Sequence, residues 1–146
     1  MKFLITEEEC KNIGCPYYTK EEYSFNFEPR LAASVSILVG DVHISFFYSK
    51  ARQISGYNPY LGWIKKDLTV PEAPQGVLRL EEEPDEDERI EGSKTWKTFF
   101  DPKTGWVCIG NEDISMEMEA VEFATNTIAV ISHGKLISIW VKPDMR

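Results

Sequence analysis

Cysteine and long hydrophobic runs are scarce in this sequence. Its three cysteines are too few to staple a fold with disulfides, and none lies in the C-x-x-C spacing that is typical of zinc and redox sites. We therefore expect free thiols, with a Cys10–Cys15 disulfide as the alternative. No run of 18 apolar residues occurs, which excludes a transmembrane helix. The first residues lead straight into three glutamates, unlike a signal peptide, so a cytoplasmic protein is expected.

Motifs for catalysis and cofactor binding are also missing. The nine glycines form neither the P-loop pattern nor G-x-G-x-x-G, and no serine lies in a G-x-S-x-G sequence. His43 is expected on the same face of a strand as Asp41 and Ser45, but such a set arises easily by chance in a hairpin. The other histidine, His133, lies in a predicted tight turn. We predict no catalytic residue, no cofactor and no metal, which favours a non-enzymatic protein.

Basic residues are fewer than acidic ones, and most of the acidic excess lies in one short segment. Sixteen Lys and Arg residues stand against 24 Asp and Glu residues, a net charge of −8. This balance argues against duplex nucleic acid and anionic membranes as partners. Residues 81–91, the acidic run, hold one base and eight acids, a net charge of −7: Glu81, Glu82, Glu83, Asp85, Glu86, Asp87, Glu88 and Glu91. Without this run the chain would be nearly neutral.

The acidic run is predicted to be an exposed loop on the rim of the fold. Like charges at this density repel one another, and Pro84 interrupts any regular helix. Three interpretations stay open: a solvated loop that aids solubility, an electrostatic docking surface for a basic partner, and a cation site. The cation site is the least favoured, because the D-x-[DN]-x-[DN]-G spacing of an EF-hand is absent.

Length and composition predict one globular domain over 1–146. The chain has 146 residues, of which 42% are hydrophobic, enough for a core of its own. A short strand is expected over 2–5. A short helix is expected over 6–14, because Thr6 and Glu9 match a capping box and Gly14 precedes Pro16. The segment 55–76, with three prolines and three glycines, is expected to be irregular.

The clearest period-two pattern predicts a hairpin over 33–48. Gly40-Asp41 is a turn dipeptide with glycine first, as a type II′ hairpin requires. Folding the chain there pairs Val39 with Val42, and the pairs that follow alternate between an apolar face and a mostly polar face. Because a slip of one residue would exchange the two faces, the register is strongly specified.

Two further hairpins are predicted in the second half of the chain. One spans 125–141 and turns at His133-Gly134, with Val130 opposite Ile137; both of its faces are apolar, as expected of a central hairpin. The other joins 95–100 to 106–110 through a five-residue loop and is expected to bring Phe100 near Trp106.

Additional strands are predicted at 23–27, 77–80 and 114–123. In the last of these Met116 and Met118 are interpreted as core residues that alternate with exposed glutamates, and a bulge near Ala120 would return Val121 and Phe123 to the core. The predicted fold is mainly β (α+β at most). We expect an antiparallel sandwich or strongly curved sheet of roughly seven to nine strands built from hairpins, with one or two short helices.

Aromatic residues are the second unusual feature. Trp96, Trp106 and Trp140 fall on predicted strands and are interpreted as core or half-buried positions. Tyr57-Asn58-Pro59-Tyr60-Leu61-Gly62-Trp63, the aromatic segment, places three large rings on a predicted loop. The segment is interpreted either as a cover folded over an open edge of the core or as a recognition surface.

The chain is small, acidic, rich in strand patterns and without a catalytic set, and in this general character it is similar to bacterial proteins that neutralise a toxin or inhibit an enzyme. The favoured hypothesis is a non-enzymatic binding protein, of immunity or inhibitor type, that docks a basic protein partner. Its predicted partner-binding residues are Tyr57, Tyr60, Trp63, Glu82, Glu83, Asp85, Glu86, Asp87 and Glu88. One alternative is a small-molecule binding protein or enzyme with a pocket beside the aromatic segment and His43; another is a structural subunit of a larger assembly.

Overall fold

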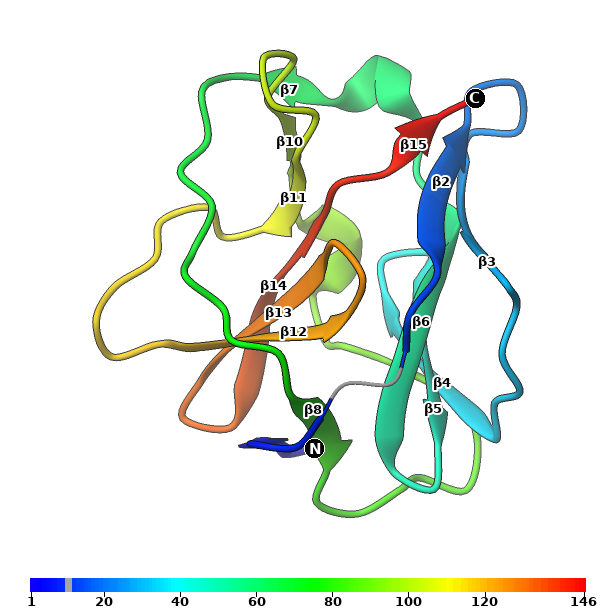
Figure 1. The fold of residues 1–146 in the computed structure, drawn as a ribbon, viewed down its shortest axis with the longest axis vertical. Helices are drawn as coiled ribbons and strands as arrows, with labels where there is room; N and C mark the ends of the chain where they lie inside the picture. Colours follow the sequence, from blue (N-terminus) through cyan, green and yellow to red (C-terminus); the bar gives the residue numbers. More distant parts are fainter. Residues whose placement is uncertain (10–11) are drawn as a thin grey trace.

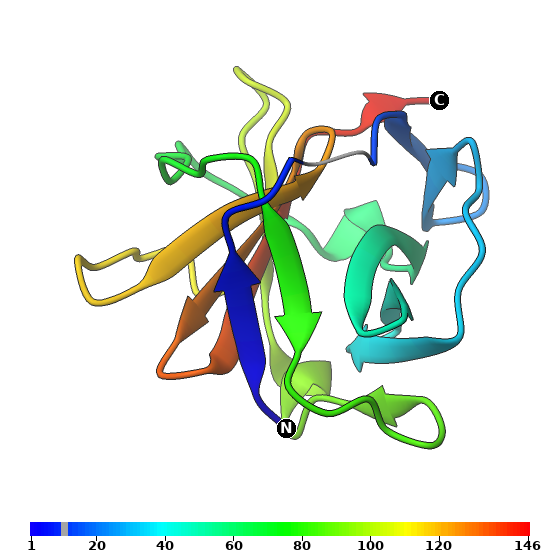
Figure 2. The same cartoon turned by 60° about the horizontal axis from the view of Figure 1, so that its bottom comes forward.

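The computed structural model describes residues 1–9 and 12–146 and consists of two β-sheets packed face to face (Figures 1 and 2). Sheet A contains β1 (Phe3–Thr6), β2 (Cys15–Thr19), β3 (Ser24–Glu28), β4 (Val35–Val39), β5 (Val42–Phe47), β6 (Lys50–Tyr57), β8 (Val77–Leu80), β9 (Glu88–Arg89) and β15 (Asp144–Met145). Sheet B contains β7 (Ile64–Lys65), β10 (Thr98–Phe100), β11 (Val107–Gly110), β12 (Glu119–Ala124), β13 (Thr127–Ser132) and β14 (Lys135–Val141). The mainly β, two-layer fold predicted from the sequence is confirmed.

The strands outnumber the prediction, and the sheets are mixed rather than wholly antiparallel. The two-residue strands β7, β9 and β15 pair in parallel with β10, β4 and β2. A strand of two residues has no alternation for a sequence to show, so these short edge pairings follow from the folding of the chain as a whole. They matter because β9, which belongs to the acidic run, covers the outer edge of β4.

The first predicted hairpin is confirmed, pair by pair. β4 and β5 pair Val39 with Val42 and Ile37 with Ile44 across the Gly40-Asp41 turn. The valines and isoleucines of these pairs are buried. On the opposite face Ser36 and His43 are partly exposed, whereas Ser45 is buried. Clean alternation fixed this register, as the hydrophobic pattern requires.

The second hairpin has the predicted turn but only part of the predicted register. Ile131 pairs with Leu136 as expected, and the register then shifts by one residue, so that Val130 lies opposite Ser138 instead of Ile137. Ile137 is the extra residue of a β-bulge on β14 and is half-exposed, unlike its buried neighbours Leu136 and Ser138. With both faces of the hairpin apolar, either register buries hydrophobic side chains, and the sequence pattern could not distinguish them.

The third hairpin also forms one residue out of the predicted register. Phe100 pairs with Val107 rather than Trp106, and Phe99 pairs with Cys108. The loop is longer than predicted because Asp101 folds it: the Asp101 backbone carbonyl accepts a hydrogen bond from Gly105, and its side chain accepts one from the Lys103 amide. A turn closed by an aspartate in this way can lengthen a loop by one residue, and the pattern of apolar residues does not indicate the change.

The strand predicted over 114–123 begins only at Glu119. Met116 is fully exposed, so its assignment to the core was wrong, and Met118 packs from a turn on the outer face of sheet B. Val121 and Phe123 are buried without a bulge near Ala120; the irregularity lies between Glu122 and Ala124 instead. The methionine–glutamate alternation was short enough to arise in a turn.

The described part of the predicted N-terminal helix, residues 6–9 and 12–14, is not helical. Thr6 ends β1, and its hydroxyl donates to Glu8 and accepts from Arg79 instead of capping a helix. The described residues contain two helical turns of three residues each, η1 (Tyr60–Gly62) and η2 (Ser93–Thr95), and hence no helix with the length and hydropathy to span a bilayer. Cys15 and Cys108 are free thiols, whereas Cys10 lies outside the described residues.

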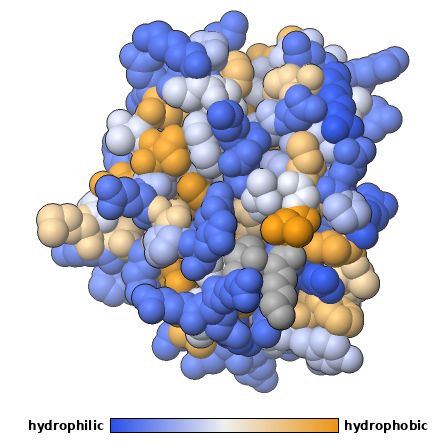
Figure 3. All heavy atoms as spheres, in the orientation of Figure 1, coloured by the Kyte–Doolittle hydropathy of each residue, from blue (hydrophilic) through white to orange (hydrophobic). Residues whose placement is uncertain are grey.

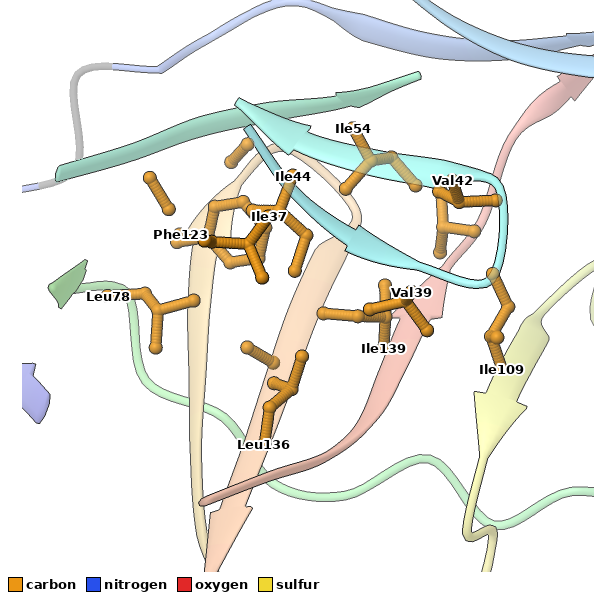
Figure 4. Packing of buried hydrophobic residues seen from close by; sticks show 14 of the residues in the cluster. Ile37, Val39, Val42, Ile44, Ile54, Leu78, Ile109, Phe123, Leu136 and Ile139 are labelled. Carbon is orange, nitrogen blue, oxygen red and sulfur yellow. The ribbon is translucent and has the colours of Figure 1, made fainter. Parts of the chain in front are cut away.

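The core fills the space between the sheets (Figure 4). Ile37 and Ile44 of the first hairpin point toward Phe123 of β12, and Val39 lies close to Ile139 of β14, all with at most 1% of their surface exposed. These contacts join residues far apart in the sequence and hold the two sheets as one body.

Sheet B is also covered on its outer face, by the segment 66–76 drawn in green at the left of Figure 1. Its side chains pack over a second cluster that contains the fully buried Cys108 and Trp140. The buried carboxylate of Asp101 fastens this cover by accepting a hydrogen bond of 3.0 Å from the Leu68 amide. That hydrogen bond is the main reason why the pKa of Asp101 is lowered from its ordinary value. Burial of the thiol raises the pKa of Cys108.

Candidate partner-binding surface

The acidic run starts at the end of β8 and finishes at the outer edge of β4. The Glu81 amide donates to the Lys2 carbonyl at 2.9 Å, which places the start of the run beside the N-terminal strand. At its other end β9 pairs with β4, and the Ile90 amide donates to the Leu38 carbonyl. The run therefore crosses from one edge of the molecule to another, and Figure 2 shows this bend in green at the lower right.

Three side chains of the run, those of Glu83, Asp87 and Arg89, tie it to the first hairpin and the residue before it. The Ser34 hydroxyl donates to Glu83 at 2.6 Å, and the Ser36 amide donates to Asp87 at 2.8 Å. Arg89 donates to the Gly40 carbonyl and to Asp41, a residue of the hairpin turn outside the run. The backbone of the run is thus held in place, which is a different arrangement from a free solvated tail.

The other acids of the run have no partner among the residues that the structure describes. Within residues 1–9 and 12–146, none of its eight carboxylates forms an ion pair; every salt bridge involves an acid elsewhere. Six of them also make no side-chain hydrogen bond to the described residues: Glu81, Glu82, Asp85, Glu86, Glu88 and Glu91. These carboxylates are displayed to the solvent on a backbone that is held in place.

Two adjoining hollows lie along the run. The first, the acidic hollow, has a volume of about 440 Å³ and is lined by Met1, Lys2, five of the acids and Pro84. The second, the Trp96 hollow, has a volume of about 630 Å³ and shares Met1 and Glu88 with the first. The sides of the Trp96 hollow are apolar where Phe3, Leu136, Ile137, Ile90 and Trp96 face it. Charge and apolar surface therefore meet at this end of the molecule.

The aromatic segment is folded into the protein. The Trp63 ring stacks on Phe25 at 5.8 Å between centroids and lies 4.8 Å from the Tyr18 ring. The Trp63 indole nitrogen donates to the Asn58 side chain at 2.9 Å, and the Tyr60 amide donates to the Tyr18 hydroxyl. Burial of Tyr18 within this cluster raises its pKa to about 12. The segment covers an open edge of the core, which is one of the two interpretations that the sequence allowed.

Of the three predicted aromatic anchors, Tyr57 is the most accessible, with 51% of its surface exposed, whereas Tyr60 and Trp63 are half-buried. The structure does not bring these rings together with the acidic run. Figure 1 shows the turn at Tyr60–Gly62 at the top of the molecule and the loop that follows β8 at the bottom. The aromatic segment begins at one end of β6, at Tyr57, and β8, which leads into the acidic run, pairs with the other end, at Lys50. The length of β6 therefore separates the two segments.

The pocket predicted beside the aromatic segment is not among the hollows described for this surface. Five hollows with volumes of about 440 to 630 Å³ are lined by described residues. None of the five is lined by Tyr57, Tyr60, Trp63 or His43. On the face of Figure 1 apolar side chains are scattered in small groups among hydrophilic ones (Figure 3), as on most monomer surfaces.

The sequence did not indicate that Trp96 and Ile137 would lie near the acidic run. Trp96 was interpreted only as a half-buried strand residue, and Ile137 as a paired one. Trp96 in fact follows η2, and Ser93 of that turn is tied to the first hairpin by accepting a hydrogen bond of 2.9 Å from the Gly40 amide. The only available signal was the short distance in sequence between Glu91 and Trp96.

Comparisons with known proteins give no further indication of function. No family model, characterised protein or solved structure matches this chain at a significant level. In the described residues no group of three or more His, Cys, Asp or Glu side chains is arranged to hold a metal ion.

Proposed function

We propose that this protein is a non-enzymatic binding protein that docks a basic protein partner on the acidic run. The single observation that supports the proposal is the group of unpaired carboxylates on a backbone fixed by Ser34, Ser36 and the β4 edge. Exposed like charges steer an oppositely charged partner and accelerate its association. An inhibitor or immunity role, in a cytoplasmic setting, is the most concrete form of the proposal.

The geometry changes the part that the aromatic segment plays in this proposal. Trp63 and Tyr60 make their contacts within the protein, so their removal would first disturb the fold. Tyr57, which is more exposed, is the member of the predicted set that remains available to a partner. The carboxylates are then expected to carry most of the recognition by charge.

The test compares three proteins as bait in extracts of the native host. The first is the wild type. The second, the run variant, carries Glu82, Asp85, Glu86 and Glu88 replaced by Gln. The third, the control variant, carries the same four-charge change outside the run, at exposed acids that have no side-chain partner among the described residues: Glu7, Glu21, Glu22 and Glu117.

A basic protein should be retained by the wild type and the control variant and lost from the run variant at about 0.15 M salt. With that protein purified, the run variant should associate more slowly and with a weaker dependence on salt, while dissociation changes little. Equal loss of binding in the run and control variants would show that only net charge matters, and the proposal would then be wrong.

A further inference from the structure

The Trp96 hollow has an apolar wall that the fold builds with two special backbone features. The Trp96 ring lies against Gly110, where φ is +106° and an added Cβ would come within 2.9 Å of the ring. Across the hollow, the bulge on β14 leaves Ile137 outside the ladder and half-exposed. Bulges redirect a side chain out of the regular alternation, and here the redirected side chain reaches the hollow.

Trp96 is exposed toward two hollows at once. It lines the Trp96 hollow and also a neighbouring one of about 490 Å³, and both include Leu136 and Ile137. Its indole nitrogen has no hydrogen-bond acceptor among the described residues, in contrast to Trp63 and Trp140, whose indole nitrogens donate to Asn58 and Ser138. A large ring with an unused donor, set at a concave surface, is the kind of residue that dominates binding energy at interfaces.

The rim of this hollow identifies the partner by charge. Glu88 and Glu91 border it, and the shared residues Met1 and Glu88 join it to the acidic hollow, whose lining includes five acids and Lys2. The bases on the rim are Arg89, which is bonded to Gly40 and Asp41, and Lys135. A segment that fills the hollow therefore places its neighbouring residues over the unpaired carboxylates.

From this juxtaposition we infer that the Trp96 hollow is the anchor pocket of the partner-binding surface and receives one large apolar side chain from a Lys- and Arg-rich segment of the partner protein. The inference rests on the proposed function and adds the kind of segment that is recognised. The carboxylates attract the segment, and the contacts of its apolar side chain with Trp96 and Ile137 slow its release. An anchor of this kind is surrounded by polar contacts that exclude water, as in known interface hot spots.

The experiment uses the full chain and two synthetic peptides as probes. Both peptides are composed of Lys, Arg, Gly and Ser, and they differ at one central position, which is Leu in the first and Ser in the second. Affinity is measured by isothermal titration, and the NMR signal of the Trp96 indole N–H, assigned through Trp96→Phe, reports on the hollow itself.

The Leu peptide should bind about tenfold more tightly than the Ser peptide, the factor expected when part of one apolar side chain is buried. Only the Leu peptide should shift the Trp96 indole signal strongly. Trp96→Ala and the milder Ile137→Ser should each remove most of the tenfold difference and leave the Ser peptide unaffected. Trp106→Ala, a change at a half-buried tryptophan outside the lining of this hollow, is the matched control and should keep the difference.

Equal affinity of the two peptides, or an equal loss of both in the Trp96 and Ile137 variants, would overturn the anchor pocket while leaving the acidic docking surface in place. Failure of the proposed function has a different signature: the run variant would bind both peptides as tightly as the wild type. If neither peptide binds more tightly than ~1 mM to the wild type, the inference is wrong as well, because its charge attraction is then absent.

Discussion

The aromatic segment and the acidic run are both irregular, both unusual in composition and both were predicted to bind a partner, yet the fold uses them in opposite ways. The aromatic segment turns inward, and Trp63 finds a stacking partner in Phe25 and a hydrogen bond to Asn58. The acidic run turns outward, and most of its carboxylates have no partner in the described residues. Burial of an aromatic ring stabilises the folded state, whereas burial of a carboxylate without a cation destabilises it. Composition therefore says more about the placement of charge than about the placement of aromatic residues.

The largest effect expected from this comparison is on the aromatic side. Trp63→Ala removes a half-buried ring that contacts Tyr18, Phe25 and Phe100, and should lower the free energy of unfolding by about 2–4 kcal/mol. Tyr57→Ala, at a half-exposed ring in the same segment, should cost less than about 1 kcal/mol. Chemical denaturation of both variants measures this. A Trp63 variant as stable as the wild type would mean that the ring is not part of the core cover.

A smaller effect is expected at an acid that the fold does use. Asp101 is buried, and its pKa is lowered chiefly by the hydrogen bond from the Leu68 amide, so its carboxylate stabilises the folded state. A lowered folded-state pKa gives stability that is present above the ordinary value of about 3.9 and is lost as the pH falls through and below it.

Asp101→Asn should therefore be less stable than the wild type at pH 7, and the gap should narrow below about pH 4. Urea denaturation at a series of pH values tests this, with Asp113→Asn, an exposed acid, as the control. A gap that stays constant with pH would show that the charge of Asp101 does not hold the cover on sheet B.

Neutralising the acidic run should change stability least among the acid substitutions. The Glu82, Asp85, Glu86 and Glu88 to Gln variant removes no ion pair, and it relieves repulsion, so the free energy of unfolding should stay within about 0.5 kcal/mol or rise. Thermal melts at low and high salt provide the measurement. Severe destabilisation would show that these acids are paired or bind a cation, contrary to their place on the surface.

No effect is expected from reductant. Cys15 and Cys108 are free thiols, and the sequence-based prediction for all three cysteines is the reduced state. Melting temperatures with and without reductant should coincide. A fall of several degrees on reduction would reveal a structural disulfide and favour the alternative pairing of Cys10 with Cys15.

The two hairpins and the N-terminal segment differ in how well their structure could be predicted from the sequence. The first hairpin was predicted in full, because Gly40 fixes the turn and alternation between an apolar and a polar face permits a single register. The second hairpin was predicted only near its turn, because Ile128, Val130, Ile137 and Ile139 leave both faces apolar and the bulge unmarked. The helix predicted over 6–14 is absent from its described residues, 6–9 and 12–14, because the capping-box residue Thr6 lies in β1 and its hydroxyl accepts a hydrogen bond from Arg79.

The mainly β fold, the first hairpin and the concentration of negative charge follow from local sequence, because each depends on neighbours along the chain. The inward packing of Trp63, the exposure of most carboxylates of the run, and the place of Trp96 and Ile137 in one hollow beside it depend on the folding of the whole chain. Those placements depend on which strands pair, on a bulge and on a glycine that admits a ring. Such contacts are set by the packing of segments that are distant in the sequence. They depend on the free energy of the whole chain, which no local sequence pattern indicates.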